Sequence, residues 1–262
     1  MWKPWLAASA AASILACGNA LAQSPQAEVT RDTPKAARDP ATVAALEKMG
    51  AALRRLDSFS VRSDVTEEKV LTTGQKIQFS GMVEAKARKP DKLQIHKVSD
   101  RQERIFYFDG QKMTLYSPRL GFYASAPAQG TIKQAVSVVA DKYNIETPLA
   151  DLFTWGEDPA DVQRLQSAFY VGAETIGGWA CDQYAMREEA TDWQVWIRQK
   201  GEALPCKLVI TSTDQPGMPQ YSSVFTWTAH LALPASTFTF VPLKDSHKIT
   251  LLDSSVDATP AN

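Results

Sequence analysis

Between residues 58 and 229 the chain repeatedly alternates apolar and polar side chains with a period of two, which is typical of half-buried β-strands. Phe59, Val61 and Val65 follow this alternation at its start. Further along, Asp109-Gly110 lies between two such runs and is a strong hairpin signal. Because short turns join successive strands of this kind, the sequence predicts an antiparallel meander.

Two segments have the three- and four-residue spacing of amphipathic helices instead. Asp39 and Pro40 supply a helix start, and an apolar stripe follows through residue 57. Residues 131–155 hold a second helical stretch and a shorter apolar element. Later strands are expected at residues 168–175, 180–188, 193–199, 207–213, 220–229 and 238–241. Strands interrupted by a helical insertion predict an α+β fold built on one large sheet.

The N-terminal segment has the pattern of a secretory signal peptide over residues 1–22. Lys3 precedes an apolar run, and residues 20–22 match a small-x-small cleavage site ending at Ala22. A second interpretation stays open, because residues 14–18 resemble a bacterial lipobox in which Cys17 is lipidated. Cleavage after Ala22 predicts a soluble protein secreted to the periplasm. Lipidation of Cys17 predicts a protein associated with a membrane and anchored to the outer membrane.

The rest of the chain divides by composition into three parts. Residues 23–38 are polar and contain prolines, so we expect a disordered linker. Residues 39–245 are expected to form the folded domain, which has the length of a single β-rich domain. Residues 246–262 are expected to be a C-terminal tail.

Signatures of catalysis and of metal binding are absent from the sequence. His96, His230 and His247 are far apart, and there is no HExxH zinc motif, GxSxG nucleophile elbow or phosphate-binding glycine loop. We therefore expect no catalytic residue, no metal and no cofactor. The 28 basic and 29 acidic residues give a net charge of −1, which argues against a nucleic-acid partner.

Cys181 and Cys206 are the two cysteines that follow the signal segment. The expected strands place them on either side of a shared neighbouring strand, where backbones are about 9–10 Å apart. That separation is too long for a disulfide unless the strand ends curl together. Two alternatives therefore stay open, which are a bridge formed in an oxidising compartment and two half-buried small apolar side chains.

Trp193 and Trp196 lie three residues apart on an expected strand, so their side chains face opposite sides of the sheet. We expect one of them in the core and the other exposed or at a rim. An exposed tryptophan would suit an interface.

A single large sheet needs a cover on its apolar face, and the helical segments offer a modest one. Two outcomes follow, since the helices either fill an ordinary core or leave a lipid-sized apolar cavity. The residues expected to line such a cavity are inward-facing strand residues and apolar residues of the helical insertion. They are Phe59, Val61, Phe79, Val83, Leu93, Ile95, Leu115, Val136, Val139, Phe153 and Trp155.

Several segments resemble the DUF2092 family of predicted bacterial periplasmic proteins, over about residues 40–245. The most specific are PLADLFTWG at residues 148–156 and WQVWI at residues 193–197. The others are residues 49–63, 81–88, 106–116, 171–187, 205–211 and 238–242.

The chain also resembles, more distantly, the superfamily of the lipoprotein carriers and receptors LolA and LolB, which includes RseB-type sensors and LppX. The shared cues are the leading helix, the hairpin at residues 171–178 and the closing strand at residues 238–242. The resemblance implies an α+β fold, an open antiparallel half-barrel of about eleven strands with helices covering a concave apolar face.

These observations lead us to expect a non-catalytic envelope protein. Its cavity would bind a lipid, an acyl chain or a lipoprotein segment, and the protein would act as a carrier or receptor. The alternative is a periplasmic regulatory sensor that uses the same cavity and contacts an envelope protein partner. An envelope hydrolase is a third class, because paired carboxylates need no local motif.

Overall fold

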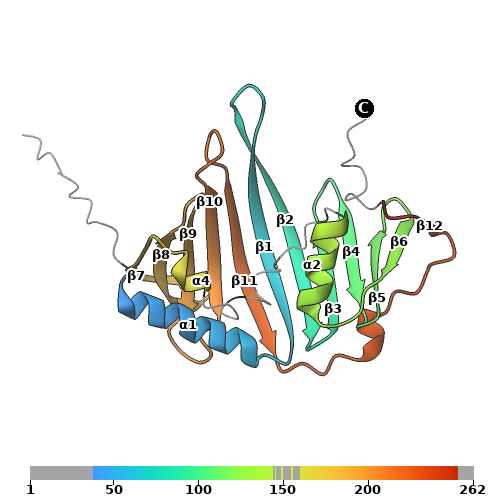
Figure 1. Cartoon of the computed structure of the whole chain (residues 1–262), viewed down its shortest axis with the longest axis horizontal. Coiled ribbons are helices and arrows are strands. Elements are labelled where there is room, and N and C mark those ends of the chain that lie inside the picture. Colours follow the sequence, from blue (N-terminus) through green and yellow to red (C-terminus); the bar gives the residue numbers. More distant parts are fainter. Residues whose placement is uncertain (1–37, 144, 146–148, 150–154, 156–159, 253–262) are drawn as a thin grey trace, which may run out of the picture. The chain divides into compact units, whose positions relative to one another are not determined.

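In the part of the chain that the computed structural model describes (residues 38–143, 145, 149, 155 and 160–252), one open sheet of 12 strands dominates (Figure 1). Its strand order is β12-β6-β5-β4-β3-β2-β1-β11-β10-β9-β8-β7. All neighbours are antiparallel except β12 and β6, which are parallel. The predicted α+β class with an open antiparallel sheet is confirmed, with one strand more than the eleven or so expected.

The first six strands form the N-terminal meander of the sheet. They are β1 (Ser58–Val70), β2 (Lys76–Arg88), β3 (Lys92–Val98), β4 (Glu103–Phe108), β5 (Lys112–Ser117) and β6 (Phe122–Pro127). The next five form the C-terminal meander, and a short last strand follows. They are β7 (Ser167–Ile176), β8 (Trp179–Arg187), β9 (Thr191–Arg198), β10 (Pro205–Ser212), β11 (Gln220–Ala229) and β12 (His247–Ile249).

The two meanders meet where β1 pairs with β11, with Phe59 opposite Ala229 and Val61 opposite Trp227. Between them the chain passes through α2 (Ile132–Tyr143) and α4 (Ala160–Gln163) and enters the sheet again at its far edge, as β7. Figure 1 shows this arrangement, with β1 and β11 in the middle and β7 and β12 at the two edges.

The first helix, α1 (Pro40–Arg55), begins and ends with favourable residues. The carboxylate of Asp39 caps it by accepting hydrogen bonds from the backbone N–H groups of Ala41 and Thr42. Pro40 occupies the first turn, where a missing N–H costs nothing, and Arg54 and Arg55 lie in the last turn, where the helix dipole favours cations. The apolar stripe of α1 therefore forms on a well-defined helix.

One face of the sheet, here called the inner face, packs against α1 and α2 and forms the main core. Its strand residues follow the two-residue alternation, and α2 adds Ile132, Ala135 and Val139. The largest fully buried members are Leu46, Leu56, Phe59, Val61, Val83, Leu93, Phe108, Met113, Val139, Val195 and Leu204. Burial of these side chains is the main driving force for folding.

The opposite, outer face of β4, β5 and β6 is covered by the chain segment that follows β11. The ring of Phe240 lies 5.6, 5.0 and 4.9 Å from the rings of Tyr107, Tyr116 and Tyr123. Phe238 is fully buried beneath the guanidinium group of Arg88. The segment thus packs across the outer face before its end joins the sheet as β12.

The prediction of a strand at residues 238–241 is wrong. The short 3-10 helix η1 (Ala235–Phe238) occupies its start, and no strand follows it until β12. The alternation there is real, because the buried Phe238 and the half-buried Phe240 both face a sheet on which their segment lies. Residues 247–249, expected in the tail, pair with residues 122–124 of β6. The sequence analysis also missed β6, whose inward residues are the small Ala124 and Ala126.

Candidate functional site

A cavity of about 310 Å³ lies between α1 and the inner face of β9, β10 and β11. This volume falls at the lower end of the range of small-molecule sites. Its lining residues come from the sheet, from α1 and from the connection around α4. They are Met49, Leu53, Trp155, Asp161, Arg164, Glu188, Thr191, Trp193, Val195, Pro205, Leu208, Ile210 and Phe225.

The floor of the cavity follows from strand register. Leu208 pairs with Val195 and Ile210 pairs with Trp193, so these four side chains share the inner face of β9 and β10. Met49 and Leu53 are four residues apart on α1 and therefore lie on one helix face above that floor. Strand and helix periodicities thus aim apolar side chains into the same space.

One wall of the cavity is the indole of Trp155. Its ring centroid lies 5.0 Å from that of Trp193, at an interplanar angle of 76°. On the other side it approaches α1 at Gly50, where an added Cβ would lie 3.2 Å from Trp155 Cδ1 and 3.3 Å from its carbonyl oxygen. The missing side chain at Gly50 therefore lets Trp155 pack directly on the helix.

The polar part of the lining is a group of charged side chains that pair with one another. The guanidinium group of Arg164 lies 2.6 Å from a carboxylate oxygen of Asp161 and 3.9 Å from one of Glu188. The other oxygen of Glu188 accepts a hydrogen bond of 3.0 Å from the indole N–H of Trp193. We name Asp161, Arg164 and Glu188 the charged rim of the cavity.

Beside the charged rim, an ion pair closes the turn between β8 and β9. Arg187 donates two hydrogen bonds of 2.7 Å to the carboxylate of Asp192. These hydrogen bonds hold the pKa of Asp192 below its ordinary value, against the opposing effect of burial. The ion pair thus fixes the turn that carries Glu188 and Thr191.

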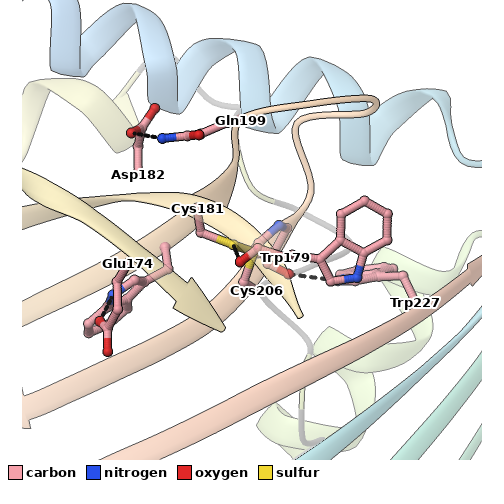
Figure 2. Close-up of a disulfide and its surroundings, with 9 residues drawn as sticks. Glu174, Trp179, Cys181, Asp182, Gln199, Cys206 and Trp227 are labelled. Atoms are coloured by element: carbon pink, nitrogen blue, oxygen red, sulfur yellow. Dashed lines mark hydrogen bonds between the residues drawn. A yellow bond between two sulfur atoms is a disulfide. The ribbon is translucent and has the colours of Figure 1, made fainter. Parts of the chain in front are cut away.

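A disulfide joins Cys181 of β8 to Cys206 of β10 across the outer face, with their Cα atoms 6.9 Å apart (Figure 2). These strands flank β9, as the sequence analysis expected. The bridge spans them because the register of β10 shifts between Pro205 and Lys207, so Cys206 lies at a β-bulge near the strand end. Of the two alternatives stated for these cysteines, the structure contains the bridge.

The disulfide is one residue away from the cavity lining. Pro205, which precedes Cys206, lines the cavity, and its carbonyl oxygen accepts a hydrogen bond of 2.8 Å from the indole N–H of Trp227. Trp196 packs against the two cysteines on the outer face and is only 4% exposed. One of the two tryptophans, Trp193, lies in the main core as expected. The exposed or rim position expected for the other is wrong, because a second small core buries the outward-facing Trp196.

Of the residues predicted to line a cavity, one lines the cavity described above and most of the others lie in or beside the main core. Trp155 lines it. Leu115 and Val136 pack at the edge of the main core, and Phe79 lies outside that core with the guanidinium of Arg101 4.0 Å from its ring centroid. Phe153 and Cys17 are outside the described residues. The remaining six are at most 2% exposed within the main core: Phe59, Val61, Val83, Leu93, Ile95 and Val139.

Most of the cavity lining was not predicted, although its residues carry recognisable sequence patterns. Met49 and Leu53 belong to the apolar stripe of the first helix, and Trp193, Val195 and Leu208 belong to alternating strands. What the pattern does not contain is the position of α1 over the C-terminal meander. Within residues 38–252, excluding the undescribed gaps, no three His, Cys, Asp or Glu side chains converge on a metal site. No helix in the same ranges is long and apolar enough to cross a membrane.

An open antiparallel sheet with helices on one face defines an α+β half-barrel protein, and the apolar cavity beneath the first helix is its candidate site. The chain belongs to the DUF2092 family, described as predicted periplasmic proteins, whose profile matches residues 42–252. No curated protein matches the sequence.

Solved structures with a similar fold share little sequence with this chain. LprF from Mycobacterium bovis is 16% identical, with 75% of this chain and 97% of that chain covered and a TM-score of 0.46. A LolA superfamily protein from Nitrosomonas europaea is 10% identical, with coverage of 76% and 97% and a TM-score of 0.38. The MucA/MucB complex from Pseudomonas aeruginosa gives 12% identity, coverage of 77% and 61% and a TM-score of 0.41.

Proposed function

We propose that this protein binds the acyl chain of a lipid or lipoprotein in the cavity beneath α1 and serves the cell envelope as a carrier or receptor. The observation that carries the proposal is the composition of the cavity lining. All of its described residues are apolar except the charged rim and Thr191. A site with this composition gains affinity from burial of an apolar ligand, at about 0.8 kcal/mol for each methylene group removed from water.

The chemistry of the lining supports binding rather than catalysis. The charged rim is internally paired, and Glu188 also accepts the hydrogen bond from Trp193. The described lining residues include no histidine or cysteine, so they offer no pairing of a thiol nucleophile with an imidazole base.

Two observations support an envelope location. The family is described as predicted periplasmic proteins. The Cys181–Cys206 disulfide is of the kind that persists in oxidising compartments such as the periplasm. The signal peptide expected at residues 1–22, with cleavage after Ala22 or lipidation at Cys17, agrees with the same compartment.

Native mass spectrometry of the full chain, purified from its host envelope without detergent, tests the proposal. We expect a fraction of the protein to carry an adduct with the mass of an acyl-bearing lipid. After delipidation, the protein should take up a fluorescent acyl probe in a one-to-one ratio. A clean apo mass together with no uptake of the probe would overturn the proposal.

A further inference from the structure

The charges at the cavity rim bear on which chains the cavity accepts. Among the described residues that line the cavity, the charged ones are Asp161, Arg164 and Glu188, so they contribute two negative charges and one positive charge. The carboxylates of Asp161 and Glu188 are largely shielded, with side-chain exposures of 13% and 26%. A bound apolar chain would bring its polar end against these groups.

Among the described lining residues Arg164 is the one cation, and its guanidinium group, which is 55% exposed, faces both carboxylates. It lies between Asp161, at 2.6 Å, and Glu188, at 3.9 Å. An incoming carboxylate or phosphate that used the remaining N–H groups of Arg164 would lie beside both carboxylates. The resulting like-charge contact is unfavourable, so the rim disfavours anionic ends.

Glu188 is fixed in place by a second contact. Its other oxygen accepts the hydrogen bond from the indole N–H of Trp193, a side chain that is itself 7% exposed. The carboxylate therefore keeps its position without Arg164. It presents oxygen atoms, which accept hydrogen bonds, to whatever occupies the cavity.

Nearby cations outside the lining have partners of their own. Arg187 pairs with Asp192, and the guanidinium groups of Arg38 and Arg54 donate to the carbonyl oxygens of Val162 and Trp155. Charges that are exposed to solvent are screened by salt, whereas charges lining a cavity are screened much less. The carboxylates of Asp161 and Glu188, at 13% and 26% exposure, are therefore screened less than the guanidinium group of Arg164, at 55%.

We infer that the cavity selects apolar chains whose polar end is cationic or donates hydrogen bonds, such as an amine or an amide, and rejects chains that end in a free carboxylate or phosphate. This inference rests on the proposed function and specifies its ligand class. The carboxylates of Asp161 and Glu188 would accept from the N–H groups of such an end.

The test compares three ligands with one chain length and different ends: dodecylamine, dodecanol and dodecanoate. Each displaces the neutral fluorescent probe N-phenyl-1-naphthylamine from the full chain, at neutral pH, low salt and ligand concentrations below micelle formation. We expect dodecylamine to bind about tenfold more tightly than dodecanoate, which corresponds to about 1.4 kcal/mol, with dodecanol between them. The ratio should shrink as salt is added.

A double variant reverses the rim charge. Asp161→Asn with Glu188→Gln leaves Arg164 as the one charged group among the described lining residues, so dodecanoate should become the tightest ligand. The single variant Glu188→Gln keeps an acceptor for the indole of Trp193 and should reduce the preference for the amine about threefold, even if the double variant does not fold. Glu47→Gln, which removes an exposed carboxylate of α1 outside the lining, should leave the preference unchanged.

The outcomes separate the inference from the proposed function. Equal binding of the three ligands, tightest binding of dodecanoate to the unaltered protein, or an unchanged preference in Glu188→Gln would overturn the inference and leave the proposed function standing. Failure of all three ligands and of the probe to bind would overturn the proposed function.

Discussion

Trp155 meets Trp193 edge to face, with ring centroids 5.0 Å apart, and both indoles line the same cavity. Trp155 comes from the connection between α2 and α4, and Trp193 comes from β9 in the C-terminal meander. The contact joins the wall of the cavity formed by Trp155 to the cavity floor on β9. Changes to the floor should therefore alter ligand binding without dismantling the rest of the core.

Leu208→Trp should fill the cavity. Leu208 points from β10 into the space beneath α1, so a larger side chain would occupy volume that a ligand would otherwise take. We expect at least a tenfold loss of affinity for an alkyl chain, measured by displacement of a fluorescent probe. The free energy of unfolding should fall by no more than about 1–3 kcal/mol, the usual cost of overpacking.

A matched control lies on the outer face of the next strand. Thr226→Trp introduces the same side chain at an exposed position of β11 that does not line the cavity. It should leave alkyl-chain affinity unchanged. Equal losses in the two variants would mean that the cavity is not where the chain binds.

Removal of the disulfide should destabilise the protein. Cys181 and Cys206 are separated by 25 residues, and the chain-entropy model assigns a loop of this size about 3.5 kcal/mol of stabilisation. We expect the double variant Cys181→Ala with Cys206→Ala to lose about this free energy of unfolding in a urea titration. Alkyl-chain affinity should also fall, because Cys206 adjoins Pro205 in the cavity lining.

Reductant supplies the control for this prediction. Adding it should shift the urea midpoint of the unaltered protein towards that of the double variant and leave the double variant unchanged. A midpoint that does not respond to reductant in either protein, combined with equal stabilities, would contradict a structural role for the bridge.

Much of the fold could be predicted because alternation reports directly on which side chains are buried. Helix α1 and the strands β7 to β11 lie close to their predicted ranges. Strand β6 was not predicted because its buried residues, Ala124 and Ala126, are small and contribute little to an apolar alternation. Strand β12 was not predicted because its three residues are exposed. At Phe238 and Phe240 the apolar alternation predicted a strand that is not there. The alternation arises because this segment packs on the face of the sheet.

The location of the cavity could not be predicted for a different reason. Periodicity assigns each side chain to a face of its own strand, but it does not say which strands a helix covers. Val61 and Val195 are both inward-facing and nearly fully buried. Val195 lines the cavity, whereas Val61 belongs to the filled core. The distinction depends on the position of α1, which follows from long-range packing.

Asp192→Asn should lower stability in a pH-dependent way. Hydrogen bonds from Arg187 lower the pKa of the folded-state carboxylate below its ordinary value of 3.8. The carboxylate therefore stabilises the fold fully above that value, and the contribution is lost as pH falls through the lowered pKa. Because the pair is partly exposed, we expect a difference of about 0.3–1 kcal/mol at neutral pH, measured by urea unfolding.

The exposed Asp214 offers a comparison for that measurement. Asp214→Asn should change stability by less than Asp192→Asn at neutral pH. A deficit of Asp192→Asn that grows as the solution is acidified, instead of shrinking, would contradict the assigned direction of the pKa change.

Affinity as a function of chain length tests the central claim most directly, using linear alcohols from octanol upward so that the charge of the end group plays no part. Filling an apolar cavity predicts that each added methylene strengthens binding by about 0.8 kcal/mol, or about fourfold, until the chain fills the available volume. The affinity should then level off, and Leu208→Trp should move the plateau to a shorter chain. Affinity that is independent of chain length, or no measurable binding at any length, would contradict an apolar-chain site beneath α1.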